Sequence, residues 1–368
     1  MIGGRTEANE RFFDAEAERI AELSLELARR FSAGGRLLAV GFSPQDWSDA
    51  HHVAVEFVHP VIVGKRALPA AALRADQLAR LAEPGDAVIG FGWPVRAPAG
   101  CLAIGFEPGA AAWEFEPGVA DPFVRQELIE TLYHVLWESV HVFLDHLGSS
   151  DSGGGSSAFL YPFLERKTTD PGALLDDVAQ SVRLKAREIG ELRGRTIGDG
   201  VAVAAAGAAL RERLGDGGKL LAFGNGGSAT DAMDIVADLE SAGHRALDLT
   251  ADASILTALA NDIGPEVLFQ RQLIAHGREG DIAVAFSTSG GSANIICALA
   301  EARARGLETI AIVGYDGGRI AAEQLADHVI VAPSEYIPRI QEAQATVYHL
   351  LCEHAVADQP ARAELARA

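Results

Sequence analysis

Two short loops rich in glycine and hydroxyl side chains are the segments of this sequence best suited to chemistry. The first runs from Asn225 to Ser228 after the apolar pattern KLLAFG, and the second runs from Ser287 to Ser292 after the next such pattern, IAVAF. Each loop is followed by a helical pattern, so backbone N–H groups and the positive end of a helix dipole converge there. Ligands of parallel sheets bind at the carboxyl ends of the strands. The two loops therefore predict a phosphate site.

The first loop also permits a different interpretation. Gly224, Gly226 and Ala229 have the spacing of the dinucleotide-binding fingerprint, and Asp248 lies about twenty residues further on. A dinucleotide fold leaves the hydroxyl-rich second loop unexplained. We therefore expect no nucleotide cofactor and keep a dinucleotide-dependent oxidoreductase as the minor alternative.

Composition and charge narrow the class of protein. The chain has 368 residues, of which 48% are hydrophobic and 22% charged, which is typical of a globular protein large enough for two domains. A net charge of -20 repels nucleic-acid phosphates, so we expect no direct nucleic-acid binding. The sequence shows no secretion signal, no membrane-length apolar run and no C-x-x-C pair. We therefore expect a cytoplasmic protein without membrane contact.

A segment rich in glycine and serine, LGSSDSGGGSS, divides the chain near its middle. Such a segment has little surface to bury and much conformational entropy to lose, which is typical of a flexible linker. We place a first domain at residues 1–146, a linker at 147–170 and a second domain at 171–368.

The two halves share an order of sequence patterns. In each half a helical pattern ends at a glycine pair, Gly34-Gly35 or Gly217-Gly218, and an apolar strand pattern follows, RLLAVG or KLLAFG. Later come PGDAVIGFG and EGDIAVAFS, and each half closes with a helical pattern, QELIETLYH or QEAQATVYH. Alternating strands and helices predict parallel α/β units. The repetition indicates an internal duplication.

Five motifs of the second half, spread over about residues 175–357, resemble the sugar isomerase (SIS) domain family and its phosphoheptose isomerase branch: GNGGS, NDIGPEVLFQRQL, STSGGSAN, GYDGGRIA and RIQEAQATVYH. The resemblance implies an α/β fold of two tandem SIS domains. Each would have a parallel five-stranded sheet flanked by helices, in a three-layer αβα arrangement like that of flavodoxin or Rossmann folds. It also implies that a sugar phosphate is contacted by Asn225, Gly226, Gly227, Ser228, Asn261, Asp262, Ser287, Thr288, Ser289, Ser292 and Gln341.

The resemblance further implies an activity. The family converts sedoheptulose 7-phosphate to a D-glycero-D-manno-heptose 7-phosphate, often with zinc. This isomerisation moves a proton between C1 and C2 through an enediol, so it needs a base, an acid and stabilisation of an oxyanion. A related branch of the family regulates or assembles other proteins without catalysis, and this is the main alternative.

The metal and acid–base residues of the family are His-x-x-x-Glu on one helix, with Gln and His eight residues apart on another. Residues four and eight apart share one helix face, so two such helices can offer four ligands to one divalent ion. The second half has Asp234 and Asp238 at the first two positions and keeps Gln341 and His349. The first half holds all four residue types, as His52, Glu56, Gln126 and His134.

These differences suggest that the halves divide the labour. The first half would supply metal ligands and acid–base groups, because residues 42–48 and 92–94 replace its phosphate loops. Glu56 is the first candidate for the base and Asp238 the second, with His134 or His349 moving the oxygen proton. The other interpretation is that the four residues are remnants of a decayed copy. Because SIS domains pair through helices, we expect a homo-oligomer in which two tandem chains form a four-domain assembly.

Overall fold

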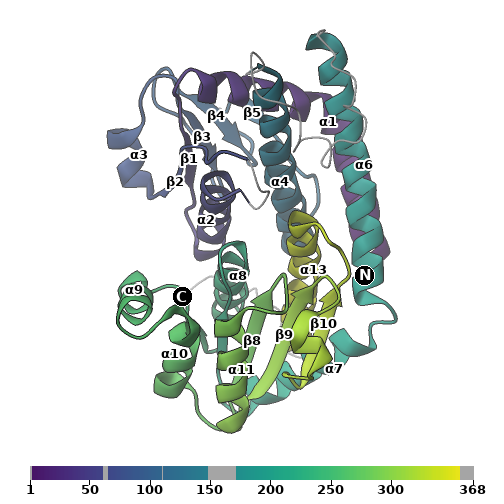
Figure 1. The fold of residues 1–368 in the computed structure, drawn as a ribbon. Coiled ribbons are helices and arrows are strands. Elements are labelled where there is room, and N and C mark those ends of the chain that lie inside the picture. The colour runs from purple at the N-terminus through teal and green to yellow at the C-terminus, as the bar shows by residue number, and fades with distance from the viewer. Residues whose placement is uncertain (1, 61–64, 110, 148–170, 357–368) are drawn as a thin grey trace. The chain divides into compact units, whose positions relative to one another are not determined.

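The structure is a computed structural model that describes residues 2–60, 65–109, 111–147 and 171–356. It divides into two compact units, residues 1–191 and 192–368, and both contain a twisted sheet with helices packed on it (Figure 1). Most of the expected linker, residues 148–170, lies outside the described residues. In the described part of the chain, no helix is both long enough and apolar enough to cross a bilayer.

The first unit is built around a parallel five-stranded sheet in the order β2-β1-β3-β4-β5. The strands are β1 (Leu37–Val40), β2 (Ala70–Leu73), β3 (Ala87–Gly90), β4 (Leu102–Gly105) and β5 (Trp113–Glu114). The helices are α1 (Ile2–Ser32), α2 (Pro44–Val58), α3 (Ala75–Leu81) and α4 (Pro122–Leu147).

The second unit repeats this topology with the order β7-β6-β8-β9-β10. The strands are β6 (Leu220–Phe223), β7 (Ala246–Asp248), β8 (Ile282–Ser287), β9 (Glu308–Gly314) and β10 (His328–Ala332). The helical segments are α7 (Val201–Gly215), α8 (Gly227–Ser241), α9 (Ala253–Asp262), η2 (Pro265–Val267), α10 (Leu268–His276), α11 (Ala293–Ala304), α12 (Gly318–Ala322) and α13 (Ile337–Val356). The prediction of two parallel five-stranded sheets is confirmed.

Strand β7 is the element that the sequence patterns did not reveal. It lies between β6 and β8 in the chain, so the two phosphate-loop strands are not consecutive. The sheet nevertheless places β6 beside β8, with Leu220 opposite Ile282. The two loops therefore emerge from neighbouring strands at one edge, as predicted.

The duplication extends to the turns that start the central strands. A Cβ atom on Gly35 would lie 2.5 Å from the carbonyl oxygen of Gly85, and one on Gly218 would lie 2.4 Å from that of Gly280. Only glycine fits such an approach of two backbones. In both units the aspartate directly after Gly85 or Gly280 accepts a hydrogen bond from the backbone N–H of the residue directly after Gly35 or Gly218. These bonds are Arg36 N to Asp86 Oδ1 (2.9 Å) and Lys219 N to Asp281 Oδ1 (3.0 Å).

Both faces of the second sheet are covered, as a parallel sheet requires. On one face, Leu221 and Phe223 of β6 join a buried cluster with Leu273 of α10 and Leu299 of α11. On the other, Phe286 of β8 meets the ring of Tyr348 on α13, with ring centroids 5.8 Å apart. The helices thus form the two outer layers of an αβα arrangement.

Helix α6 (Pro171–Ile197) crosses the division between the units. Its earlier residues are held in the first unit by buried polar contacts. Asn9 Nδ2 of α1 donates to the carbonyl oxygen of Ala186 at 2.8 Å, and Lys185 pairs with Glu138 of α4. These contacts explain why the compact units divide after residue 191, whereas the sequence interpretation begins the second domain at residue 171.

Candidate functional site

The turn between β6 and α8 is open at the N-terminus of the helix. A Cβ atom on Gly224 would lie 2.1 Å from the carbonyl oxygen of Ser228, so the chain folds back tightly where the strand ends. Gly226 is the N-cap residue, with φ of 59°, and no side chain caps the helix. Among the described residues, none accepts a hydrogen bond from the N–H of Gly226 or Gly227. These two donors and the helix dipole are available to an anion.

The second loop follows β8 and presents hydroxyl groups. Ser287 Oγ accepts the N–H of Gly290 at 3.2 Å, and Ser289 Oγ accepts the N–H of Gly291 at 3.2 Å. Because both oxygens act as acceptors inside the loop, their O–H protons are available to donate outward. Ser292 is the N-cap residue of α11 and makes no side-chain capping bond. The predicted Ser287, Ser289 and Ser292 thus border one loop that can donate to phosphate oxygens.

This second loop is held in place by the loop that follows β9. Gly290 has φ of 60°, and a Cβ atom there would lie 2.1 Å from the carbonyl oxygen of Gly317. Ile320 N donates to Gly290 O at 2.9 Å, and Gly314 N donates to Thr288 O at 3.0 Å. The motif GYDGGRIA therefore holds the second loop in place through backbone hydrogen bonds.

Two of the predicted contact residues lie apart from these loops. Asn261 and Asp262 end α9, both are exposed, and Asn261 Nδ2 donates to Asp262 Oδ1 at 2.7 Å. The described hydrogen bonds do not connect either residue to the loops. Their assignment as substrate contacts stays a prediction.

The carboxylate of Asp248, on which the dinucleotide interpretation depends, forms hydrogen bonds within the turn that follows it. Its Oδ1 accepts both the N–H of Thr250 at 2.7 Å and the hydroxyl of Thr250 at 2.6 Å. Burial raises the pKa of Asp248 even though both bonds act in the opposite direction. This geometry gives the carboxylate a role in shaping the turn after β7.

The second unit contains a buried acid–histidine group on α8 and α13. His349 Nε2 lies 4.0 Å from Asp238 Oδ2, and the hydroxyl of Tyr348 donates to Asp234 Oδ2 at 2.6 Å. All four side chains are buried, as is Gln341 on α13. The structure thus brings together the predicted Asp238 and His349.

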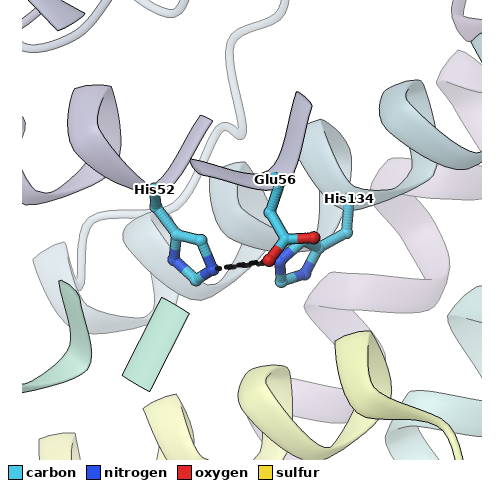
Figure 2. A group of neighbouring side chains, drawn as sticks. All are labelled: His52, Glu56 and His134. Atoms are coloured by element: carbon cyan, nitrogen blue, oxygen red, sulfur yellow. Dashed lines mark hydrogen bonds and ion pairs between the residues drawn. The ribbon is translucent and has the colours of Figure 1, made fainter. Parts of the chain in front are cut away.

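The first unit has the corresponding group on α2 and α4, with histidine and glutamate in place of the two aspartates (Figure 2). His52 Nε2 lies 3.9 Å from Glu56 Oε1 and 3.3 Å from His134 Nε2. One ligand atom from each of His52, Glu56 and His134 lies within 4.8 Å of the others, and all three are buried. Gln126 lies on α4 two turns before His134. Two imidazole nitrogens and a carboxylate oxygen form a set that suits zinc or a similar divalent ion.

The protonation of His52 fits this chemistry. Burial lowers the pKa of His52 well below its usual value, and the neighbouring His134 lowers it further. The neutral imidazole is the form that binds a metal. The hydroxyl of Tyr133 lies 3.0 Å from His52 Nδ1, which leaves Nε2 toward Glu56 and His134. Partners of this kind orient metal-binding histidines.

The first unit closes the turn that the second leaves open. Ser43 caps α2 in a reciprocal capping box, in which Asp46 N donates to Ser43 Oγ at 3.2 Å and Ser43 N donates to Asp46 Oδ2 at 2.8 Å. Pro44 is the first helical residue and has no N–H. A Cβ atom on Gly92 would lie 2.0 Å from Asp46 Oδ2. The Asp46 carboxylate therefore lies where the two loops of the first unit meet.

The strand pairing shows what replaces the second loop in the first unit. Leu37 pairs with Ala87 and Leu220 pairs with Ile282, so Gly92, Trp93 and Pro94 stand where the second unit has Ser287, Thr288 and Ser289. None of the three replacements has a hydroxyl group. Phe42 and Trp93 are exposed at this edge, with ring centroids 6.1 Å apart.

Sequence reasoning did not single out Asp46, Tyr133, Tyr348 or Asn294. The spacing of Ser43 and Asp46 is that of a capping box, and this signal could have revealed the closed turn. Both tyrosines precede the aligned histidines in the closing helices, so the repeat itself contained them. Asn294 forms a contact between two loops, which no local pattern indicates.

The sequence is similar to one domain family and to named enzymes. A family model described as SIS domain matches residues 199–314, within the second unit. The phosphoheptose isomerase of Geotalea daltonii is 47% identical over 150 residues, which are 39% of this chain and 77% of that protein. The phosphoheptose isomerase of Geobacter sulfurreducens is 41% identical over 186 residues, which are 49% of this chain and 96% of that protein.

A solved structure extends the similarity of fold to both units. The C-terminal domain of glucosamine-fructose-6-phosphate aminotransferase from Francisella tularensis aligns with a TM-score of 0.58 and 11% identity, over 95% of each chain. At this identity the match concerns the fold alone. It agrees with a tandem of two similar α/β domains.

Proposed function

Because the chain belongs to the SIS domain family, and to its phosphoheptose isomerase branch, we propose that it isomerises sedoheptulose 7-phosphate to a D-glycero-D-manno-heptose 7-phosphate. The reaction class is ketose–aldose isomerisation of a phosphorylated sugar. The observation that carries the proposal is the pair of loops after β6 and β8, which offer open donors at one sheet edge.

In this proposal the second unit binds the phosphate. The N–H groups of Gly226 and Gly227 and the hydroxyls of Ser287 and Ser289 all donate, and phosphate oxygens only accept. Charge-assisted bonds of this kind are stronger than neutral ones. A protein with a net charge of -20 needs such local donors, because its overall field repels the substrate. The binding energy holds the reacting carbons in position.

Each unit offers an acid–base pair for the proton transfer between C1 and C2. The first candidate for the base is Glu56, in the same buried group as His134, and the second is Asp238, which lies 4.0 Å from His349. Glutamate has one more methylene than aspartate and extends further from its helix. A carboxylate takes the carbon-bound proton and an imidazole moves the proton of the oxygen.

The residues fit a divalent metal in the first unit, where His52, Glu56 and His134 would be ligands and Gln126 a fourth. A zinc ion there would polarise a carbonyl oxygen. Tyr133 would keep the His52 ring in its ligating orientation through the bond to Nδ1.

The proposal is tested at the second loop by Ser287→Ala and Ser289→Ala. A hydrogen bond to a charged group contributes about 1.5–3 kcal/mol, so each change should weaken sedoheptulose 7-phosphate binding roughly 10- to 100-fold in calorimetry. Ser241→Ala is the matched control, because this serine donates only to the carbonyl of Asp238 at the other end of α8. Unchanged affinity in both loop variants would refute the phosphate assignment.

One observation favours a second candidate function. In this proposal the second unit binds the sugar phosphate through its loops, yet it has Asp234 and Asp238 in place of the histidine and glutamate that the first unit keeps. A sugar-phosphate-binding regulatory protein would have these properties. It predicts tight binding of the sugar phosphate with no turnover, which an assay of product formation distinguishes from the enzyme.

A further inference from the structure

Two asparagine side chains join the phosphate loops of the second unit. Asn225 follows β6, and Asn294 lies in the first turn of α11 after the second loop. Asn225 Nδ2 donates to Asn294 Oδ1 at 3.0 Å, and Asn294 Nδ2 donates to Asn225 Oδ1 at 2.8 Å. This reciprocal pair connects the first loop with the start of α11, the helix that follows the second loop.

A backbone group determines which way the two amides point. Ile295 N donates to Asn294 Oδ1 at 3.0 Å, so this position of the Asn294 amide must be the oxygen. The amide nitrogen of Asn294 then faces Asn225, and only the oxygen of Asn225 can accept from it. The orientation of the Asn225 amide follows from the helix backbone through Asn294.

This orientation leaves Asn225 with one side-chain N–H group that can donate to a ligand at the sheet edge. Its oxygen accepts from Asn294 and one of its two N–H groups donates to Asn294. No described residue accepts from the second N–H. Asn225 can therefore present a donor to a ligand, and the facing ligand atom must be a hydrogen-bond acceptor.

The pair contributes little to folding. Asn225 is exposed and Asn294 half-buried, so water competes for both amides and the net stabilisation is small. The strands on either side are already joined through four residue pairs of the β6–β8 ladder. The two bonds instead determine the direction of one donor, the second N–H of Asn225.

We propose that Asn294 is a positioning residue that holds Asn225 as an N–H donor to an oxygen of the phosphorylated sugar. The inference rests on the proposed sugar-phosphate site of the second unit. It also predicts selectivity, because an ammonium group in place of that oxygen would face a donor and bind poorly.

The test is a double-mutant cycle on the full chain, with sedoheptulose 7-phosphate binding measured by calorimetry. Loss of the Asn225 donor or of its orientation should weaken binding roughly 5- to 20-fold in both Asn225→Ala and Asn294→Ala. Because Asn294 acts through Asn225, Asn294→Ala should change affinity less than about twofold in the Asn225→Ala background. Gln270→Ala is the control, since it removes another amide contact to α11, the bond to Glu301.

Asn294→Asp supplies a second variant that keeps the acceptor for Ile295 N. It cannot donate to Asn225 and should therefore weaken binding as well, with an unchanged melting temperature. Unchanged affinity of Asn294→Ala, or an equal loss in both backgrounds, would overturn the inference and leave the proposed function standing. A wild-type protein that binds no sugar phosphate would overturn both.

Discussion

The N-terminus of α2 in the first unit is closed by its own side chains, whereas the corresponding turn before α8 in the second unit is open. Both turns follow the same strand of the same topology, and both begin with a glycine, Gly41 or Gly224, whose Cβ would strike the following helix. The first unit places the Asp46 carboxylate against the helix N-terminus, and the second offers unoccupied N–H groups. The same fold therefore has a carboxylate at this turn in one copy and leaves N–H donors available to an anion in the other.

The paired helices show the opposite distribution. The first unit has His52, Glu56 and His134 together, at distances that allow them to hold one metal ion. The second keeps His349 and a tyrosine bonded to Asp234, so its geometry survives while its ligand chemistry differs. The two units thus share one fold while their site chemistry differs.

The two candidate bases give the largest expected contrast. Removing a general base costs about 10²- to 10⁴-fold in turnover, and we expect Glu56→Gln to show this loss and Asp238→Asn to show less. The reason is the greater reach of the glutamate side chain. Steady-state turnover of sedoheptulose 7-phosphate measures both. A larger loss in Asp238→Asn would assign the chemistry to the second unit.

The second phosphate loop should be the next most sensitive feature. Gly290→Ala introduces a Cβ that would lie 2.1 Å from Gly317 O, at a φ of 60° that side chains disfavour. The loop must shift, and a displacement of about 1 Å can cost roughly 100-fold in catalysis. The measurement is kcat/KM with sedoheptulose 7-phosphate.

Gly291→Ala is the matched control for this loop. A Cβ atom on Gly291 would meet nothing closer than Ser289 Oγ at 3.8 Å. We expect its kcat/KM to stay within a few-fold of the wild-type value. Equal losses in the two variants would show that the support from Gly317 does not determine the loop's function.

Much of this architecture could be predicted because it depends on local rules. Glycine pairs before apolar runs marked the starts of β1 and β6, and the loop at Ser287 marked a strand end. The short strand β7 was not predicted, because Ala246–Asp248 has only three half-buried residues and no apolar run. The boundary between the two units, which lies within α6, was also not predicted. It depends on buried contacts between segments far apart in sequence, such as the hydrogen bond from Asn9 to Ala186.

The site was predictable where a residue acts through its type and spacing. His52 and Glu56 are four apart on one helix, and the helix period alone places them on one face. Asn294 could not be found this way, because its role depends on the neighbouring position of two strands. Asp46 lay within a segment interpreted only as a lost phosphate loop, and its capping bonds show that this side chain closes the turn.

Substitutions of the candidate metal ligands should affect the two units differently. We expect the change in metal affinity to be smaller than the loss of turnover on removal of the base. Loss of an outer-shell partner costs roughly 10- to 100-fold in metal affinity, so loss of a ligand in His52→Ala or His134→Ala should cost at least that. Elemental analysis and zinc titration of the purified variants measure the change. His349→Ala, the equivalent change in the second unit, should retain the metal of the wild type. Unchanged zinc affinity in both first-unit variants would identify the group as a remnant.

The smallest expected effect concerns the closed turn of the first unit. Asp46→Ala removes one half of the capping box, which should cost about 1 kcal/mol and lower the melting temperature by roughly 2–4 °C. Asp46→Asn keeps a side-chain acceptor and should lose less. Neither variant should gain phosphate binding, because Pro44 has no N–H and Gly92, Trp93 and Pro94 have no hydroxyl. If the first unit of Asp46→Ala bound phosphate, the Asp46 carboxylate alone would account for the difference in phosphate binding between the two turns.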